Sequence, residues 1–205
     1  MNEAEERVVP KLIDFGAFAE YRRMTNVDKI GRRALANNAF DGILTMIGVL
    51  MGSYIGGIQE ARIVLSTGLA TCMAMGISGA WGSWFAESAE RKQDMRELGQ
   101  AMLRDMGQSK HARASRFAVV VVSLIDGLAP LVAGLVAISP FLFASVWPNI
   151  LYTYVASLIM SFFALFGLGA FLARVARESI IRSGLRMILA GLVCVGLSFL
   201  LNTKG

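Results

Sequence analysis

Charged residues are scarce in this sequence, and cysteine is almost absent. Only 17% of the 205 residues are Asp, Glu, Lys or Arg, whereas 55% are hydrophobic, and the mean hydropathy is +0.56. This composition is too apolar for an average soluble domain and excludes a disordered chain. Cys72 and Cys194 both fall within apolar runs. We therefore expect two small buried side chains, and neither a disulfide nor a metal clip.

The sequence also lacks the residue patterns of the common enzyme classes. Its single histidine, His111, lies in a polar stretch without a neighbouring Cys or a second His, which indicates a surface residue. No Ser-His-Asp or Cys-His set, phosphate-binding glycine loop or zinc-ligand spacing is present in the sequence. We therefore expect no enzymatic activity and no permanently bound cofactor.

Long apolar runs make up most of the chain. A hydrocarbon core of about 30 Å requires roughly 20 apolar residues in a helix. Five runs meet this length, at about 38–58, 63–86, 116–138, 141–173 and 184–202. The sequence therefore predicts an all-α polytopic membrane protein with five transmembrane helices. Tight turns are expected at 57–62 and at Ser139 and Pro140.

Two segments are expected outside the bilayer, and they divide the chain into four parts. Residues 1–36 alternate apolar and charged positions in a helical rhythm and contain no signal-peptide core, which predicts an amphipathic helix on the membrane or on a cytoplasmic loop. Residues 37–86 form the first hairpin. Residues 87–115 predict a helical extension of the second span and a short turn at 107–111, and the last three spans occupy 116–205.

The basic residues predict the orientation. With the N-terminus in the cytoplasm, all of the 20 Lys and Arg except Arg62 and Lys204 lie on the inner side. This is a strong form of the positive-inside rule. It places the C-terminus outside and explains the net charge of +5 without nucleic acid as a partner.

Two acidic side chains lie within the apolar runs. Asp41 and Asp126 are each followed by glycine about one turn into a span, and this similarity leaves an internal duplication open. An ionisable group inside a membrane is a candidate functional residue. A carboxylate can bind a divalent cation when ionised and a proton when the cation leaves. The alternative for each Asp is a structural hydrogen bond to a neighbouring helix.

Glycine recurs on the first span at every fourth residue, at Gly48, Gly52 and Gly56. Such a stripe permits close approach between membrane helices. Asp41 and Thr45 lie on roughly the same face. We expect either a homodimer that brings two copies of Asp41 toward one central path, or close packing within one subunit.

Methionine is frequent, with 11 copies. Thioethers bind borderline ions such as ferrous iron and have little use for magnesium or calcium. A thioether beside a carboxylate predicts a transition-metal path, for which Met46, Met73 and Met75 are candidates together with Asp41. Core packing is the alternative for each methionine.

A third acidic feature follows the second span. Four carboxylates spaced at i, i+3, i+7 and i+10 share one helix face and repel each other, which a divalent cation would relieve. They are Glu87, Glu90, Asp94 and Glu97. The face predicts a site that collects metal ions at the inner mouth. The alternative is a solvated helix in which Glu87 pairs with Arg91.

Two segments resemble the vacuolar iron transporter family. The stretch NNAFDGILTMIGVLMG at 37–52 is similar to that family's Asn-Asp-Gly-Leu-Val-Thr signature, and 169–201 resembles its last two spans, including an Arg-Ser-Gly-Leu-x-Met turn at 182–187. The resemblance implies a five-span dimer, a divergent prokaryotic-type member in the inner membrane, that exports iron(II) or manganese(II) from the cytosol in exchange for protons. It places Asp41 in the ion path.

The sequence departs from the family at the inner end of the second span. Where the family has Ser-Met-Ala-Ala-Gly-Glu-Tyr, residues 78–84 read SGAWGSW, so that Gly79 and Ser83 replace the path methionine and glutamate. Three hypotheses follow. The first is metal export with Asp41 as the ion-binding residue and Asp126 as a second candidate. The second is a transport-inactive relative that acts as a membrane-embedded binding or scaffold protein. The third is transport of another cationic solute along a path lined by Trp81, Trp84 and Tyr54.

Overall fold

The protein folds as a bundle of long helices. The computed structural model describes residue 25, residues 27–101 and residues 110–202. Within these residues five helices are long and apolar enough to cross a membrane, and no strand occurs. They are α2 (Val27–Ile55), α3 (Ala61–Ala101), α4 (Lys110–Ile138), α5 (Ile150–Ala176) and α6 (Ile180–Asn202), with a short 3-10 helix η1 (Ser139–Val146) after α4. The predicted all-α polytopic fold is confirmed.

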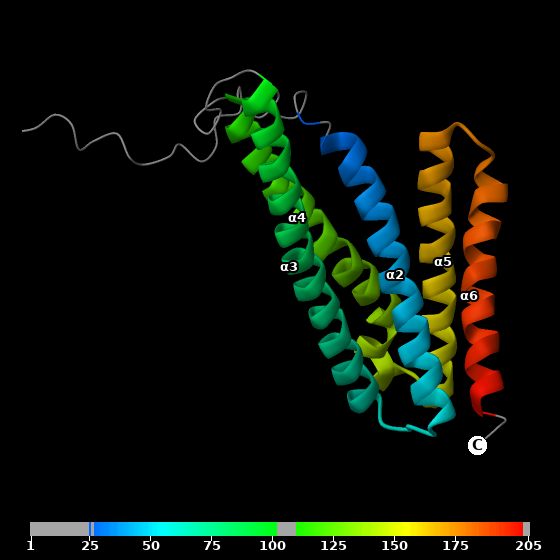
Figure 1. Ribbon diagram of the computed structural model, residues 1–205. Helices are drawn as coiled ribbons and strands as arrows, with labels where there is room; N and C mark the ends of the chain where they lie inside the picture. The colour runs from blue at the N-terminus through cyan, green and yellow to red at the C-terminus, as the bar shows by residue number, and fades with distance from the viewer. Residues whose placement is uncertain (1–24, 26, 102–109, 203–205) are drawn as a thin grey trace, which may run out of the picture.

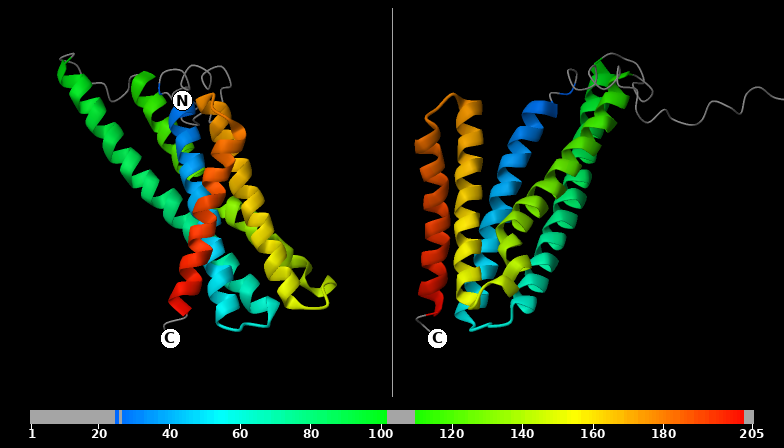
Figure 2. Two further views of the ribbon diagram at one scale, coloured as in Figure 1. Left: turned by 90° about the vertical axis from the view of Figure 1, so that its right-hand side faces the viewer. Right: turned by 180° about the vertical axis from the view of Figure 1, so that it is seen from behind.

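The helix α2 lies at the centre of the bundle. It contacts all four other long helices, while α3 packs mainly on α4 and α5 mainly on α6 (Figure 1). One end of the bundle holds the start of α2, the C-terminal end of α3, the start of α4 and the α5–α6 turn (Figures 1 and 2). This end carries every described Lys and Arg except Arg62. We call it the basic end.

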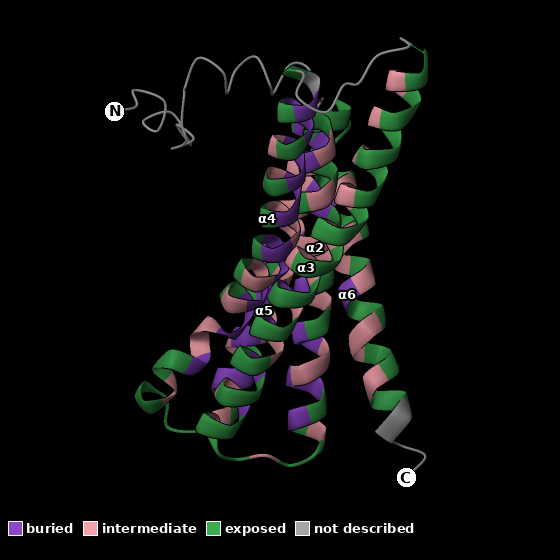
Figure 3. Cartoon of the chain, turned by 60° about the vertical axis from the view of Figure 1, so that its left-hand side comes forward, coloured by how far each residue is buried: buried purple, intermediate pink, exposed green. Residues whose placement is uncertain are grey.

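Two small cores hold α2 against its neighbours. One core contains Met46, Leu50 and Cys72, and the other joins Ile47 of α2 to Leu165 of α5. Most other large apolar side chains are exposed. Figure 3 shows exposed residues along the outer faces of the helices. On α4 the exposed ones recur at every fourth residue, at Val120, Leu124, Leu128, Val132 and Val136. Such a face is suited to lipid, because it carries no polar side chain.

The structure changes the expected limits of the first span. The helix α2 starts at Val27 and includes part of the segment 1–36, because no proline interrupts the chain between 27 and 55. The rest of the predicted amphipathic helix lies outside the described residues. The extension of the second span is confirmed, since α3 continues without a break to Ala101. His111 belongs to the first turn of α4, so the predicted turn at 107–111 is wrong at its last two residues.

The third span ends at Ile138, directly before the predicted Ser139 and Pro140, but the chain does not yet turn there. The chain continues through η1 to Val146 and turns at 147–149. Pro140 is tolerated because it occupies the first turn of η1, where its missing N–H removes no helical hydrogen bond. The side chain of Asn149 then accepts a hydrogen bond from the Leu151 N–H at 2.9 Å and caps α5.

The segment 182–187 lies in a helix instead of the expected turn. It forms the first turns of α6, and the chain reverses at Arg177, whose φ of 57° is the left-handed conformation that commonly ends a helix. Gly184 permits α5 and α6 to touch, because a Cβ on Gly169 would lie 2.7 Å from the Gly184 Cα. The close contact explains why the segment needs glycine.

Candidate functional site

A stripe of polar and small residues runs along α2 and faces away from its cores. Asp41, Thr45 and Gly52 are exposed, and Gly48 is partly exposed. The residues are separated by three or four positions, so they share one face of the helix. We call this face, Asp41, Thr45, Gly48 and Gly52, the α2 stripe.

No described residue packs against the two glycines of the α2 stripe. A Cβ added at Gly48 or Gly52 would meet no atom within 4 Å. By contrast, a Cβ at Gly42 would lie 2.5 Å from the carbonyl oxygen of Pro130, so Gly42 is the glycine that brings α2 close to α4. The predicted third member, Gly56, lies beyond the end of α2 at Ile55. The glycine stripe was explained either by a homodimer or by close packing within one subunit. Gly48 and Gly52 give no support to packing within one subunit.

Asp41 stands on this open face. It has no hydrogen bond or ion pair with any other described residue. A carboxylate at membrane depth that faced lipid alone would cost several kcal/mol, on the order of 3 on insertion scales. We therefore expect an ionised Asp41 to face water, a bound cation or another protein surface.

Asp126 has a different environment. The Asn38 side-chain amide donates a hydrogen bond of 2.6 Å to its carboxylate, and the same amide donates to the Ala34 carbonyl oxygen at 2.9 Å. Asn38 lies one turn from Asp41, about 4.5 Å along the α2 axis. The two acids therefore lie at a similar depth, but Asp126 is half-buried and joins α4 to α2.

The methionines do not gather around Asp41. Met46 is fully buried in the core with Leu50 and Cys72, and Met75 packs partly against the same core. Met73 is 59% exposed on α3. Core packing, the alternative for each methionine, describes Met46 in this structure.

The two departures from the family lie in α3, and packing explains one of them. A Cβ at Gly79 would lie 2.5 Å from the carbonyl oxygen of Asp126. A methionine in that position would push α3 away from α4. Ser83 is partly exposed, one turn further toward the basic end. The glycine thus permits a close contact between α3 and α4.

The acidic face of α3 forms no compact cluster. Glu87 accepts a hydrogen bond from Arg91 at 3.3 Å, which is the pairing that the solvated-helix alternative predicts, and Glu97 accepts one from Gln93 at 3.0 Å. Glu90 and Asp94 are exposed. No group of three or more His, Cys, Asp or Glu within 25, 27–101 and 110–202 is placed to hold one metal ion.

Three aromatic residues that we expected along one path lie apart. Trp81 and Trp84 line a hollow between α3 and α4, whereas the Tyr54 ring lies 5.5 Å from the ring of Tyr154 near the opposite end of the bundle. They do not line a common path.

Sequence reasoning missed the partner of Asp126 and a buried polar stripe on α5. The polar Asn38 in a helix that crosses a membrane is itself a signal, but its partner is 88 residues away. The α5 stripe, Thr153, Ser157 and Ser161, recurs at every fourth residue and is fully buried. The fourfold spacing of these residues can be read from the sequence. The stripe marks the face on which α5 packs.

Comparison with known proteins identifies the family of this chain. A sequence model of the VIT family matches residues 100–203, which is about half of the sequence and includes α4, α5 and α6. The chain belongs to the VIT family. It is also 26% identical over 175 residues to an uncharacterized protein of Methanocaldococcus jannaschii, which covers 84% of this chain and 88% of that protein.

Family membership and five apolar helices make this VIT-family chain an integral membrane protein. The family suggests transport of metal ions across the membrane and no enzymatic activity. The matched residues contain Asp126 but not the α2 stripe. The role of Asp41 therefore depends on the geometry described above.

Proposed function

We propose that this protein exports iron(II) or manganese(II) from the cytoplasm in exchange for protons. The observation that carries the proposal is the position of Asp41, which is exposed at membrane depth and has no partner within the described residues. A carboxylate in this place is suited to hold a cation and, after its release, a proton. Thr45, one turn along the same face, adds a hydroxyl oxygen as a further ligand.

A second copy of the chain completes the site in this proposal. The α2 stripe has room for a neighbouring helix, since added Cβ atoms at Gly48 and Gly52 meet nothing. Small residues at this spacing favour close helix packing. A two-fold axis beside the stripe places two Asp41 carboxylates on one path, and two carboxylates hold a divalent cation better than one.

Other residues assist at the basic end, which we take as the cytoplasmic side because of its Lys and Arg. The exposed Glu90 and Asp94 of α3 attract cations to the entrance. The carboxylate of Asp126 accepts a hydrogen bond from Asn38 and lies about one helical turn from the level of Asp41. We assign it a supporting role, because its hydrogen bond already satisfies one of its oxygens.

The transport reaction can be measured in proteoliposomes with a pH-sensitive dye inside. Manganese(II) or iron(II) added on the side of the basic end should drive proton flux in the native protein, while magnesium should not. Asp41→Asn should abolish the flux. Glu60→Gln, at the exposed α2–α3 connection, is the matched control and should keep it. Equal flux in Asp41→Asn and Glu60→Gln would contradict the proposal.

A second candidate is a binding or scaffold protein without transport. It is favoured by Gly79, whose position cannot hold the path methionine of the family, and by the burial of Met46 in the core. Calorimetry on the purified protein separates the two. Heat of manganese(II) binding that disappears in Asp41→Asn supports the transporter, and absence of binding in the native protein supports the scaffold.

A further inference from the structure

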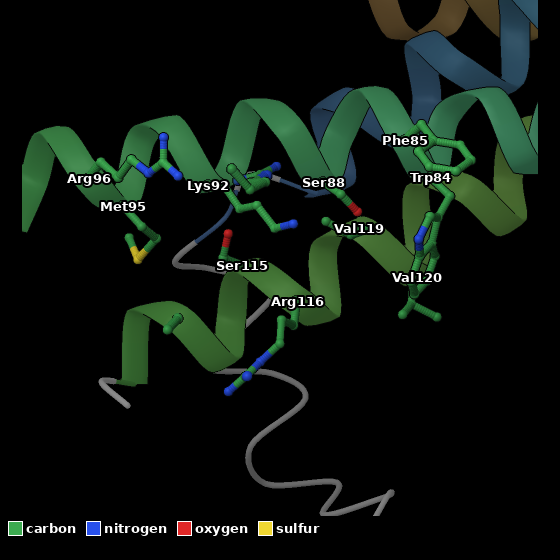
Figure 4. A pocket seen from close by; sticks show the side chains of 12 residues that line it. Trp84, Phe85, Ser88, Lys92, Met95, Arg96, Ser115, Arg116, Val119 and Val120 are labelled. Carbon is green, nitrogen blue, oxygen red and sulfur yellow. The ribbon is translucent and has the colours of Figure 1, made fainter. Parts of the chain in front are cut away.

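A hollow lies between α3 and α4 at the basic end of the bundle. It has a volume of about 720 Å³ and is lined by Arg91, Lys92 and Arg96 of α3 and by Arg116 of α4. Figure 4 shows the Lys92 side chain extending into the space between the two helices, with Ser88 and Ser115 pointing into the same space. The hollow thus combines cationic groups with hydroxyl donors.

Most of this positive charge is not neutralised. Arg91 pairs with Glu87 at 3.3 Å. Lys92, Arg96 and Arg116 have no ion pair with another described residue. Three cations around one hollow repel each other, and an anion between them relieves that repulsion.

The hollow continues toward the middle of the membrane. A second hollow of about 530 Å³ shares Trp84, Phe85 and Val120 with the first. Its remaining lining is apolar apart from Ser123, whose hydroxyl is buried and has no hydrogen-bond partner within the described part of the chain. Ser123 lies seven residues beyond Arg116, about 10 Å along α4.

We propose that the two hollows together bind one anionic phospholipid from the leaflet at the basic end. The phosphate binds Lys92, which extends into the hollow, while the lining residues Arg96 and Arg116 supply further positive charge at its rim. An acyl chain follows the apolar groove toward Leu124. A free phosphate ion would leave the groove empty, and a zwitterionic lipid would place its own cation among those of the protein.

The site is independent of metal transport and is tested by lipid binding. The delipidated full-length protein is titrated with a short-chain phosphatidylglycerol and with the matching phosphatidylcholine, and bound lipid is counted by native mass spectrometry. Phosphatidylglycerol should bind more tightly. Lys92→Ala and Arg116→Ala should each weaken its binding about fivefold, the effect of about one basic residue at a membrane surface. Arg113→Ala, an exposed cation of α4 outside the hollow, should leave binding unchanged.

Two further arms separate the contributions of headgroup and chain. Leu124→Trp fills the apolar groove without changing charge and should also weaken phosphatidylglycerol binding. Inorganic phosphate in the millimolar range should not displace the lipid. Equal affinity for the two lipids, equal losses in Lys92→Ala and Arg113→Ala, or displacement by inorganic phosphate would overturn the proposal.

Discussion

The hydrogen bond from Asn38 to Asp126 is a polar contact between α2 and α4. Asn38→Ala leaves the half-buried Asp126 carboxylate without its donor, and such a loss destabilises by about 1–3 kcal/mol. The measurement is thermal or denaturant unfolding of the protein in detergent. Asn37→Ala, at the exposed neighbouring position, is the control and should change stability little.

A double-mutant cycle checks the cause of that effect. If the hydrogen bond is responsible, Asn38→Ala should cost much less when Asp126 is already replaced by Ala. Additive losses would show that Asn38 acts through some other contact.

Gly79 is the second position where a single residue decides packing. Alanine favours helices over glycine by about 1 kcal/mol, but at residue 79 its Cβ would meet the Asp126 carbonyl oxygen at 2.5 Å. We expect Gly79→Ala to lower the unfolding free energy by about 1–3 kcal/mol through overpacking. Gly82→Ala, on the same helix with nothing within 4 Å, should be neutral or stabilising. Equal stability of the two variants would be inconsistent with the close contact.

At the scale of single helices, the α2 stripe gives a prediction about assembly. Gly52→Leu fills the space that a second copy would occupy, and we expect the dimer dissociation constant to rise about tenfold or more, since overpacking a close contact costs about 1–3 kcal/mol. Gly167→Leu on α5, also without neighbours within 4 Å, is the control. Mass photometry or cross-linking in native membranes provides the readout. A monomeric native protein, or a dimer that tolerates Gly52→Leu, would contradict the proposed interface.

The helices themselves follow from the sequence because the membrane imposes a length on apolar runs. The five spans and the long extension of α3 were predictable on this ground. Their ends were not. Pro140 predicts a turn, and α4 does end at Ile138, but proline at the start of a 3-10 helix removes no hydrogen bond, so the chain turns only after Val146. A helix was expected over residues 1–36, but its continuity with the first span from Val27 was missed, because no apolar run covers residues 27–36.

The candidate site was predictable only in part. The spacing of Asp41, Thr45 and Gly48 places them on one face whatever the fold, because the helical period alone fixes it. Met46 is five residues from Asp41 and lies in the core. Which face of α2 meets the core depends on α3 and α5, and the sequence alone does not reveal those contacts.

On the scale of the whole molecule, the bundle leaves its central helix open on one side. α2 contacts every other long helix, yet the α2 stripe stays uncovered. The exposed stripe of α4 is entirely apolar, as lipid contact requires, whereas that of α2 carries a carboxylate and a hydroxyl. The proposed metal export therefore requires that the α2 stripe face an aqueous ion path and not lipid.

Thiol reactivity tests this claim most directly. In a Cys72→Ala, Cys194→Ala background, Thr45→Cys places a thiol one turn from the intact Asp41. Val132→Cys, on the lipid-facing stripe of α4, is the control. The account predicts that a water-soluble thiol reagent modifies Thr45→Cys but not Val132→Cys, and that manganese(II) slows the reaction unless Asp41 is also replaced by Asn. Equal inertness of the two thiols, or a reaction that manganese(II) leaves unchanged, would contradict it.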